Sequence, residues 1–148
     1  MEINGKEYTL EYTVEASLCA ECIEKTVNLF MTVAEAQDER DVKKFLTSMT
    51  DIPKTALTLF YGGLLENHGD EVKSIADAKR LVSAYFKENK DKEDANFYGL
   101  LELCLTQMKE DGFFKQIGLE QMMNQTEETE GKTTHMNRQQ RRAKASEK

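Results

Sequence analysis

The spacing of the apolar residues constrains the fold more than any other feature of this chain. From about residue 14 to about residue 124, apolar side chains recur mostly at intervals of three or four. That is the period of helices that each bury one face. Residues 7–12 instead alternate polar and apolar side chains, the pattern of a strand with one buried face. The sequence therefore predicts a short strand region followed by helices.

The strand region contains a hairpin signal. Asn4-Gly5 precedes the alternating segment, and this dipeptide readily takes positive φ at both central turn positions. The apolar residues of the segment are Tyr8, Leu10 and Tyr12. A lone hairpin is only marginally stable in water, so we expect its apolar face to pack on the helices.

Capping and breaking residues divide the helical part. We expect helices at about 14–37, 41–49, 51–67, 74–88, 96–112 and 113–124. Pro53 suits the first turn of a helix that Asp51 can cap. Ser74 with Asp77 resembles a capping box, and Asn96 could cap the fifth helix. The predicted fold class is α+β, mostly α: an N-terminal β-hairpin packed on a bundle of about five or six helices.

Two helices carry specific packing expectations. In the first helix we expect one inward apolar stripe, made of Leu18, Cys22, Val27, Phe30, Met31 and Ala34. The third helix contains Gly62-Gly63, at a cost of roughly 1 kcal/mol per glycine relative to alanine. Close backbone packing at this pair is the compensation that we expect.

Charge divides the chain into a body and a tail. Residues 136–148 hold five basic groups and one acid, whereas residues 1–135 hold 15 basic and 26 acidic side chains, a formal charge of −11. We expect a hairpin plus helical body over residues 1–124, and a disordered polar linker and basic tail over 125–148. The basic groups of the tail include Arg138, Arg141, Arg142 and Lys144. The tail is either a solvated end, a segment that binds an acidic protein or RNA, or a segment that becomes helical on binding.

The acidic body argues against two classes of partner. It repels phosphate backbones and anionic lipid head groups, so we expect neither nucleic-acid nor membrane binding there. No apolar run approaches the roughly 18 residues needed to span a bilayer, and the N-terminus lacks the pattern of a signal peptide. These features predict a cytoplasmic protein whose three cysteines are free thiols.

Cys19 and Cys22 have the C-x-x-C spacing. A zinc site would need two further ligands, and only Cys104 and His68 are candidates, neither of them beside another ligand. A thioredoxin-like redox role is disfavoured because the motif falls inside a long helix pattern without a flanking βαβ unit. We therefore expect both cysteines to pack as small apolar residues, with no metal and no cofactor.

No motif indicates an enzyme. His135 lies in the polar linker, and His68 lies at a predicted helix end, where histidines commonly meet the helix dipole. The acidic residues fall on polar helix faces or in charged loops, so no pair stands out for acid–base catalysis. Gly62-Gly63 lacks the other residues of a phosphate-binding loop.

Apolar residues near the end of the body allow two interpretations. They could form an adaptable docking surface for another protein, or they could complete the core. These residues are Phe113, Phe114, Ile117, Leu119, Met122 and Met123.

Three stretches carry a resemblance to a known family. The opening sequence Met1–Tyr12 resembles the start of tail assembly chaperones of long-tailed, siphovirus-type bacteriophages of low-GC Gram-positive hosts. Members of that family have a short hairpin, a helical body and a mid-chain helix similar to residues 56–65. Many small phage structural-gene products also end in a sequence like Asn137–Ala143. The resemblance covers most of the body and departs at the Cys19/Cys22 pair.

The resemblance implies a function. Such chaperones bind the long helical tape-measure protein in the host cell cytoplasm during virion morphogenesis, keep it soluble and help recruit tail-tube subunits. They are late proteins and are absent from the mature virion. Many also exist in a longer, frameshifted form that contacts the tube protein, which would make this chain the shorter product. A homo-oligomer is compatible with this role. The alternative is a small phage or bacterial adaptor that binds nucleic acid or an acidic partner through its basic tail.

Overall fold

The computed structural model describes residues 1–35 and 42–121, with the side chains of residues 32–49 left out. It has a two-stranded antiparallel hairpin followed by helices, which confirms the mostly α, α+β fold. The elements are β1 (Glu2–Ile3), β2 (Lys6–Glu7), α1 (Val14–Leu18), α2 (Ala20–Glu35), α3 (Val42–His68), α4 (Ile75–Glu88), α5 (Phe97–Glu110) and α6 (Phe113–Gln116). The chain divides into two compact units, Met1–Phe113 and Phe114–Lys148.

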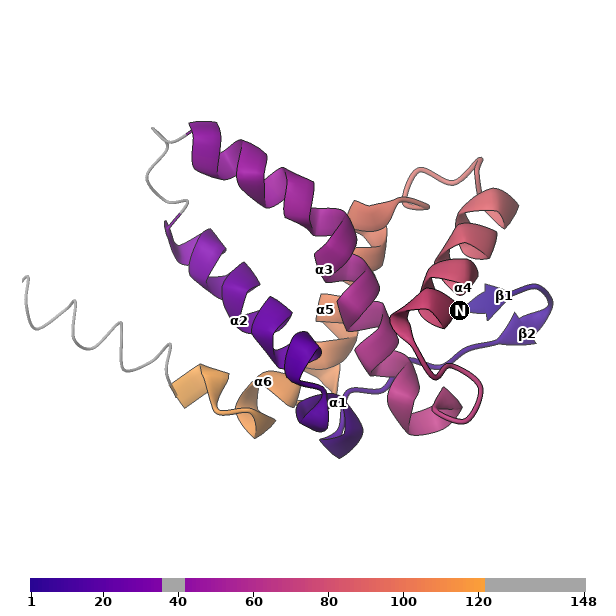
Figure 1. Cartoon of the computed structure of the whole chain (residues 1–148), viewed down its shortest axis with the longest axis horizontal. Helices are drawn as coiled ribbons and strands as arrows, with labels where there is room; N and C mark the ends of the chain where they lie inside the picture. The colour runs from indigo at the N-terminus through magenta and orange to yellow at the C-terminus, as the bar shows by residue number, and fades with distance from the viewer. Residues whose placement is uncertain (36–41, 122–148) are drawn as a thin grey trace, which may run out of the picture. The chain divides into compact units, whose positions relative to one another are not determined.

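Helix α3 is the centre of the first unit. It packs most extensively on α5 and also contacts α1, α2 and α4. Figure 1 shows α2 on one side of α3, and α4 with the hairpin on the other. The fully buried large side chains include Tyr12, Phe60, Leu64 and Met108. They come from the N-terminal segment, from α3 and from α5, so the core lies where these three elements meet.

The predicted hairpin is confirmed. Asn4 has φ 53° and Gly5 has φ 75°, and Ile3 pairs with Lys6 across this two-residue turn. Positive φ at both positions matches the right-handed twist of the strands. The Asn4 N–H donates a 2.9 Å hydrogen bond to the Glu88 carboxylate, so the turn is held against the end of α4.

The second strand is shorter than the alternation predicts, because it ends at Glu7. The alternating burial nevertheless continues, with Tyr8, Leu10 and Tyr12 inward. Tyr8 still pairs with Met1, donating its N–H to the Met1 carbonyl at 2.7 Å. Beyond it the backbone N–H groups of the segment must still find acceptors. Helical residues and the end of α5 supply them: Thr9 donates to His68 Nε2 (3.1 Å), Glu11 to the Gly63 carbonyl (2.9 Å) and Tyr12 to the Asp111 carboxylate (2.9 Å).

The glycine pair of α3 allows the close approach that its sequence predicts. A Cβ atom added at Gly62 would lie 2.6 Å from Cys22 Sγ, and one at Gly63 would lie 2.8 Å from the Tyr12 ring. The Tyr12 hydroxyl donates a 2.7 Å hydrogen bond to the Leu59 carbonyl. Helix α2 and the extended segment therefore both contact α3 where α3 has no side chains.

Two predicted helix boundaries are wrong. The expected helix 14–37 is interrupted at Cys19, whose ψ of 100° separates α1 from α2. The expected helices 41–49 and 51–67 form one helix, α3, with Pro53 in its interior. Pro53 has no N–H to donate to the carbonyl four residues earlier. The loss of this one hydrogen bond does not end the helix, because α3 packs on α1, α2, α4 and α5.

The predicted caps at Ser74 and Asn96 are confirmed, whereas Asp51 lies inside α3 and caps no helix. The Ser74 hydroxyl accepts a hydrogen bond from the Asp77 N–H at 3.3 Å, and Asn96 Oδ1 accepts one from the Gly99 N–H at 2.9 Å. The capping box is shifted by one residue, because the Asp77 carboxylate accepts from the N–H of Lys73. Each cap satisfies a helical N–H that would otherwise lack an acceptor.

The expected last helix, 113–124, is not continuous. Gly112 has φ 70° and closes α5 as predicted, but Gly118 has φ 80°. A left-handed residue ends the α-helical path, so α6 stops at Gln116 and a new helical turn begins at Leu119. Residues 122–124 of the predicted helix lie outside the described residues.

The caps generate the first prediction. Ser74→Ala and Asn96→Ala should each lower the free energy of unfolding by about 1 kcal/mol, because each removes an N-cap acceptor. Urea unfolding measures the change. Ser83→Ala is the matched control, because Ser83 is exposed inside α4 and caps nothing. A Ser74→Ala variant as stable as Ser83→Ala would refute the capping account.

The glycine contact generates the second prediction. Gly62→Ala should destabilise the protein by about 1–3 kcal/mol, because the new methyl group meets Cys22 Sγ. In a Cys22→Ala background the sulfur is gone and alanine is the better helix former, so the same substitution should cost less. We expect a coupling energy of about 0.5–3 kcal/mol in this double-mutant cycle. Equal effects of Gly62→Ala in both backgrounds would contradict the contact.

Candidate partner-binding surface

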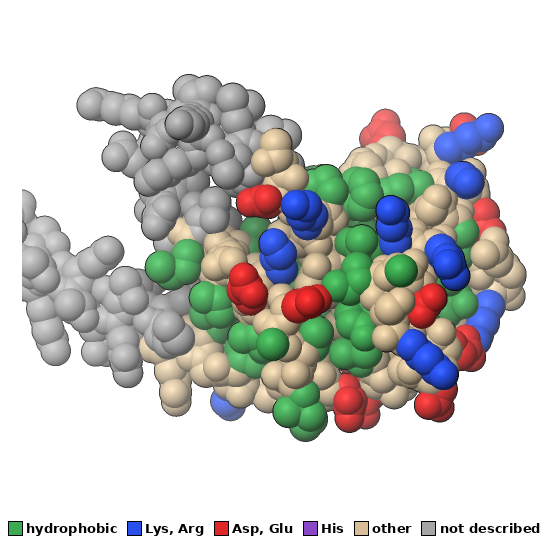
Figure 2. Space-filling model, viewed as in Figure 1, with side chains coloured by type: hydrophobic (Ala, Val, Ile, Leu, Met, Phe, Trp, Pro, Cys, Tyr) green, Lys and Arg blue, Asp and Glu red, His purple; other side chains and the backbone are tan. Residues whose placement is uncertain are grey.

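Large apolar side chains of α1 and α2 are exposed in the described part of the chain. Val14 is 61% exposed, Leu18 is 74% exposed and Met31 is 57% exposed. Ile23, Val27 and Phe30 of α2 are half-buried. We call these six residues the α1–α2 apolar face. Figure 2 shows hydrophobic side chains at the surface over α2 and beside α3, among scattered charged groups.

Helix geometry explains why this face is only partly buried. Successive residues of an α-helix are about 100° apart, so Cys22 and Thr26 share one edge of α2, and both are fully buried. Ile23, Val27 and Phe30 lie on a neighbouring edge and are covered only in part. The apolar arc of α2 is therefore wider than the edge that packs on the core.

This surface corrects the single inward stripe predicted for the first helix. Cys22 is buried as predicted, but Leu18 and Met31 are exposed, and Val27 and Phe30 are only half-buried. The side chain of Ala34 lies outside the described residues. The sequence could have shown this. The apolar arc of the helix carries Cys22 and Thr26 on one edge and Ile23 and Val27 on the next, and an arc that wide does not fit one packing interface.

The residues proposed for docking at the end of the body are not equivalent. Phe113 is fully buried, and its ring centroid lies 5.7 Å from that of Tyr12. It is therefore a core residue, as one of the two interpretations held. Phe114 and Ile117 are half-buried, and Leu119 is 5% exposed. Met122 and Met123 lie outside the described residues.

The basic tail also lies outside the described residues. Arg138, Arg141, Arg142 and Lys144 belong to the range 122–148, which the structure does not describe. Their expected role as a solvated end or a binding segment stays a prediction.

The three cysteines differ in burial. Cys19 is half-exposed, whereas Cys22 and Cys104 are buried. Burial raises the pKa of the Cys22 thiol to about 12, with a smaller contribution from Cys19. Burial likewise raises the pKa of Cys104 to about 12. Among the residues that the structure describes, no group of three or more His, Cys, Asp or Glu side chains is placed to hold a metal ion.

His68 has a packing role. As the last residue of α3, it accepts the Thr9 N–H through Nε2 and stacks on the Tyr8 ring at 5.0 Å between centroids. The sequence placed it at a helix end, and the structure adds that its imidazole holds the extended segment.

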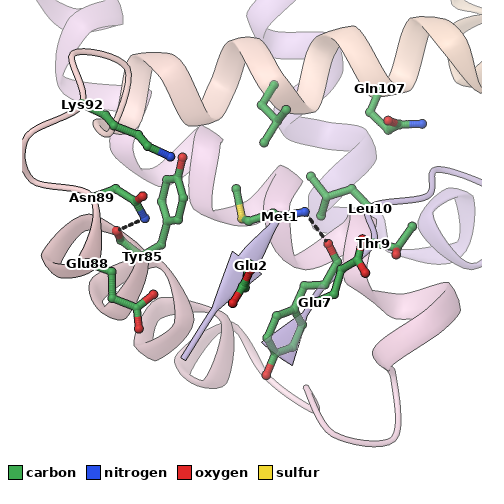
Figure 3. A pocket seen from close by; sticks show the side chains of 12 residues that line it. Met1, Glu2, Glu7, Thr9, Leu10, Tyr85, Glu88, Asn89, Lys92 and Gln107 are labelled. Carbon is green, nitrogen blue, oxygen red and sulfur yellow. Dashed lines mark hydrogen bonds between the residues drawn. The ribbon is translucent and has the colours of Figure 1, made fainter. Parts of the chain in front are cut away.

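A groove of about 630 Å³ is the second candidate surface. It lies among the hairpin, the end of α4 and α5, with Glu2, Glu7 and Glu88 in its lining. Figure 3 shows the Lys92 side chain reaching toward the Tyr85 ring beside Asn89. The volume suits a small ligand, but no histidine or cysteine lines the groove. Its residues can offer hydrogen bonds and charge to a ligand, and nothing in the lining selects one.

Comparison with known proteins finds no relative. No protein-family model, no curated protein and no solved structure matches the chain. Within the described part of the chain, no helix combines the length and the apolar character needed to cross a bilayer.

Proposed function

We propose that this protein is a non-enzymatic tail assembly chaperone of a long-tailed bacteriophage. In this role it binds the tape-measure protein in the host cytoplasm, keeps it soluble and helps recruit tail-tube subunits before leaving the finished particle. The observation that carries the proposal is the α1–α2 apolar face. An exposed apolar surface on a helix is suited to an amphipathic helical partner.

Residues that prompted the family resemblance support the proposal by their structural roles. The Met1–Tyr12 segment forms the hairpin and the extended segment. The stretch 56–65 supplies the glycine pair on which Tyr12 and Cys22 pack. Two of the three resembling stretches thus build the body and orient α2, while the third lies outside the described residues. Recruitment of the tube protein, through this chain or a longer frameshifted form, belongs to the same proposal.

Charge and energetics are consistent with reversible coating of an insoluble partner. The formal charge of −7 on the whole chain favours solubility of a complex that carries many copies. Full burial of an exposed Leu or Met side chain contributes about 1.5–3 kcal/mol, whereas association costs about 4–15 kcal/mol. A face with a few such residues gives modest affinity per copy. Many copies on one long partner can still cover it, and each can be released.

Co-expression with the tape-measure protein tests the proposal. The wild-type chain should move that partner from the pellet to the soluble fraction. The double variant Leu18→Glu/Met31→Glu should leave it insoluble, because two carboxylates would be buried at the interface without partners. The readout is the soluble fraction of the partner and its co-purification with each chain.

The matched control is Tyr98→Glu/Leu103→Glu. These two α5 residues are also exposed, at 67% and 42%, and Leu103 lines the groove. This variant should solubilise the partner as well as the wild type does. If only the control variant failed to solubilise the partner, the binding surface would lie at α5 and the groove. A tape-measure protein that stays insoluble with the wild-type chain would overturn the proposed function.

Deletion of residues 136–148 separates this proposal from an adaptor that works through its tail. The truncated chain should keep the tape-measure protein soluble, because the α1–α2 apolar face remains. Salt-sensitive RNA or DNA binding by the full chain that disappears on truncation would support the adaptor instead.

A further inference from the structure

The break at Cys19 changes the setting of the C-x-x-C motif. The redox interpretation was disfavoured because the motif was expected inside a long helix, but α1 ends at Leu18 and α2 begins at Ala20. The Cys19 carbonyl accepts the Ile23 N–H at 3.1 Å, which is the first bond of α2. Cys19 is therefore the N-cap residue of α2, and Cys22 is the third residue of that helix.

This position brings the two side chains to the same turn. The side chain of an N-cap residue points toward the third helical residue, the geometry by which Ser or Asn caps a helix. Helix geometry places Cα atoms three residues apart roughly 5 Å from one another, which lies within the Cα separation of disulfides, about 4.4–6.8 Å. Their Cβ atoms are roughly 5–6 Å apart at this spacing and must approach to about 3.5–4.5 Å in a disulfide. Only a modest adjustment of the first turn is needed to join the two sulfur atoms.

The two thiols also differ in access. Cys19 is half-exposed at the break, whereas Cys22 is fully buried against Gly62. An incoming reagent therefore meets Cys19 first. Cys22 lies one helical turn away, and because burial raises its pKa it must lose its proton before its sulfur displaces whatever Cys19 has bound. Cys104 is buried on α5, so it provides an internal reference thiol.

We propose that Cys19 and Cys22 form a dithiol that small-molecule disulfides oxidise to an intramolecular disulfide. In the first step the Cys19 thiolate attacks one sulfur of the reagent. A Cys19 mixed disulfide forms, the reagent's S–S bond breaks, and the leaving thiolate takes up the proton that Cys19 lost. In the second step Cys22 sulfur attacks Cys19 sulfur and expels the second thiolate, which takes the Cys22 proton. Two protein thiols are oxidised and one small disulfide is reduced to two thiols.

The second step has a structural consequence. Cys22 Sγ lies within contact distance of the Gly62 position, and it must turn away from α3 to reach Cys19. Oxidation should therefore loosen the contact between α2 and α3, and the oxidised chain should unfold at a lower temperature than the reduced one. Reduction with dithiothreitol should restore the original midpoint.

The test uses the folded full-length chain and oxidised glutathione. After incubation, free thiols are alkylated in denaturant and the peptides are mapped by mass spectrometry. We expect loss of two free thiols per chain, a Cys19–Cys22 disulfide, and an alkylated Cys104. Cys22→Ser should stop at one glutathione on Cys19, and Cys19→Ser should leave Cys22 and Cys104 unreacted.

Three results would overturn the proposal. They are a wild-type chain that accumulates the mixed disulfide on Cys19, a disulfide that joins Cys22 to Cys104, and a chain that does not react while folded. Each is read from the wild-type peptide map, so the conclusion does not depend on the stability of a variant.

Discussion

The close contact at Gly62 and Gly63 is the constraint on which the rest of the structure depends. Two successive residues of α3 lack side chains, so Cys22 of α2 and Tyr12 of the extended segment can both lie against its backbone. Tyr12 then bonds the Leu59 carbonyl and packs on Phe113 beyond the end of α5. The cost of two glycines in a helix, roughly 1 kcal/mol each, is offset by the packing that they allow.

The same contact creates the candidate binding surface. Because α2 is held by the edge that carries Cys22 and Thr26, the neighbouring edge with Val27 and Phe30 is only half-buried. Leu18 lies beyond the break at Cys19 and is exposed. The apolar surface that we assign to a helical partner thus follows from how the core fixes the rotation of α2.

The sequence correctly predicted features that depend on only a few neighbouring residues. The turn at Asn4-Gly5 and the caps at Ser74 and Asn96 depend on a few adjacent residues, and all three were correct. The break at Cys19 and the passage of α3 through Pro53 depend on tertiary packing, which single-residue preferences do not contain. The candidate binding surface was missed for a similar reason: periodicity identifies apolar residues, but it does not say which edge of a wide arc the core will cover.

The central claim is that α1–α2 is the surface that meets the partner, and methionine methyl NMR tests it most directly. Met31 is 57% exposed on that surface, whereas Met108 is fully buried in the core. With methyl-labelled methionine, the account predicts that the Met31 signal shifts or broadens in the co-purified complex with the tape-measure protein, while the Met108 signal keeps its position. A complex in which the Met31 signal is unchanged would contradict the account.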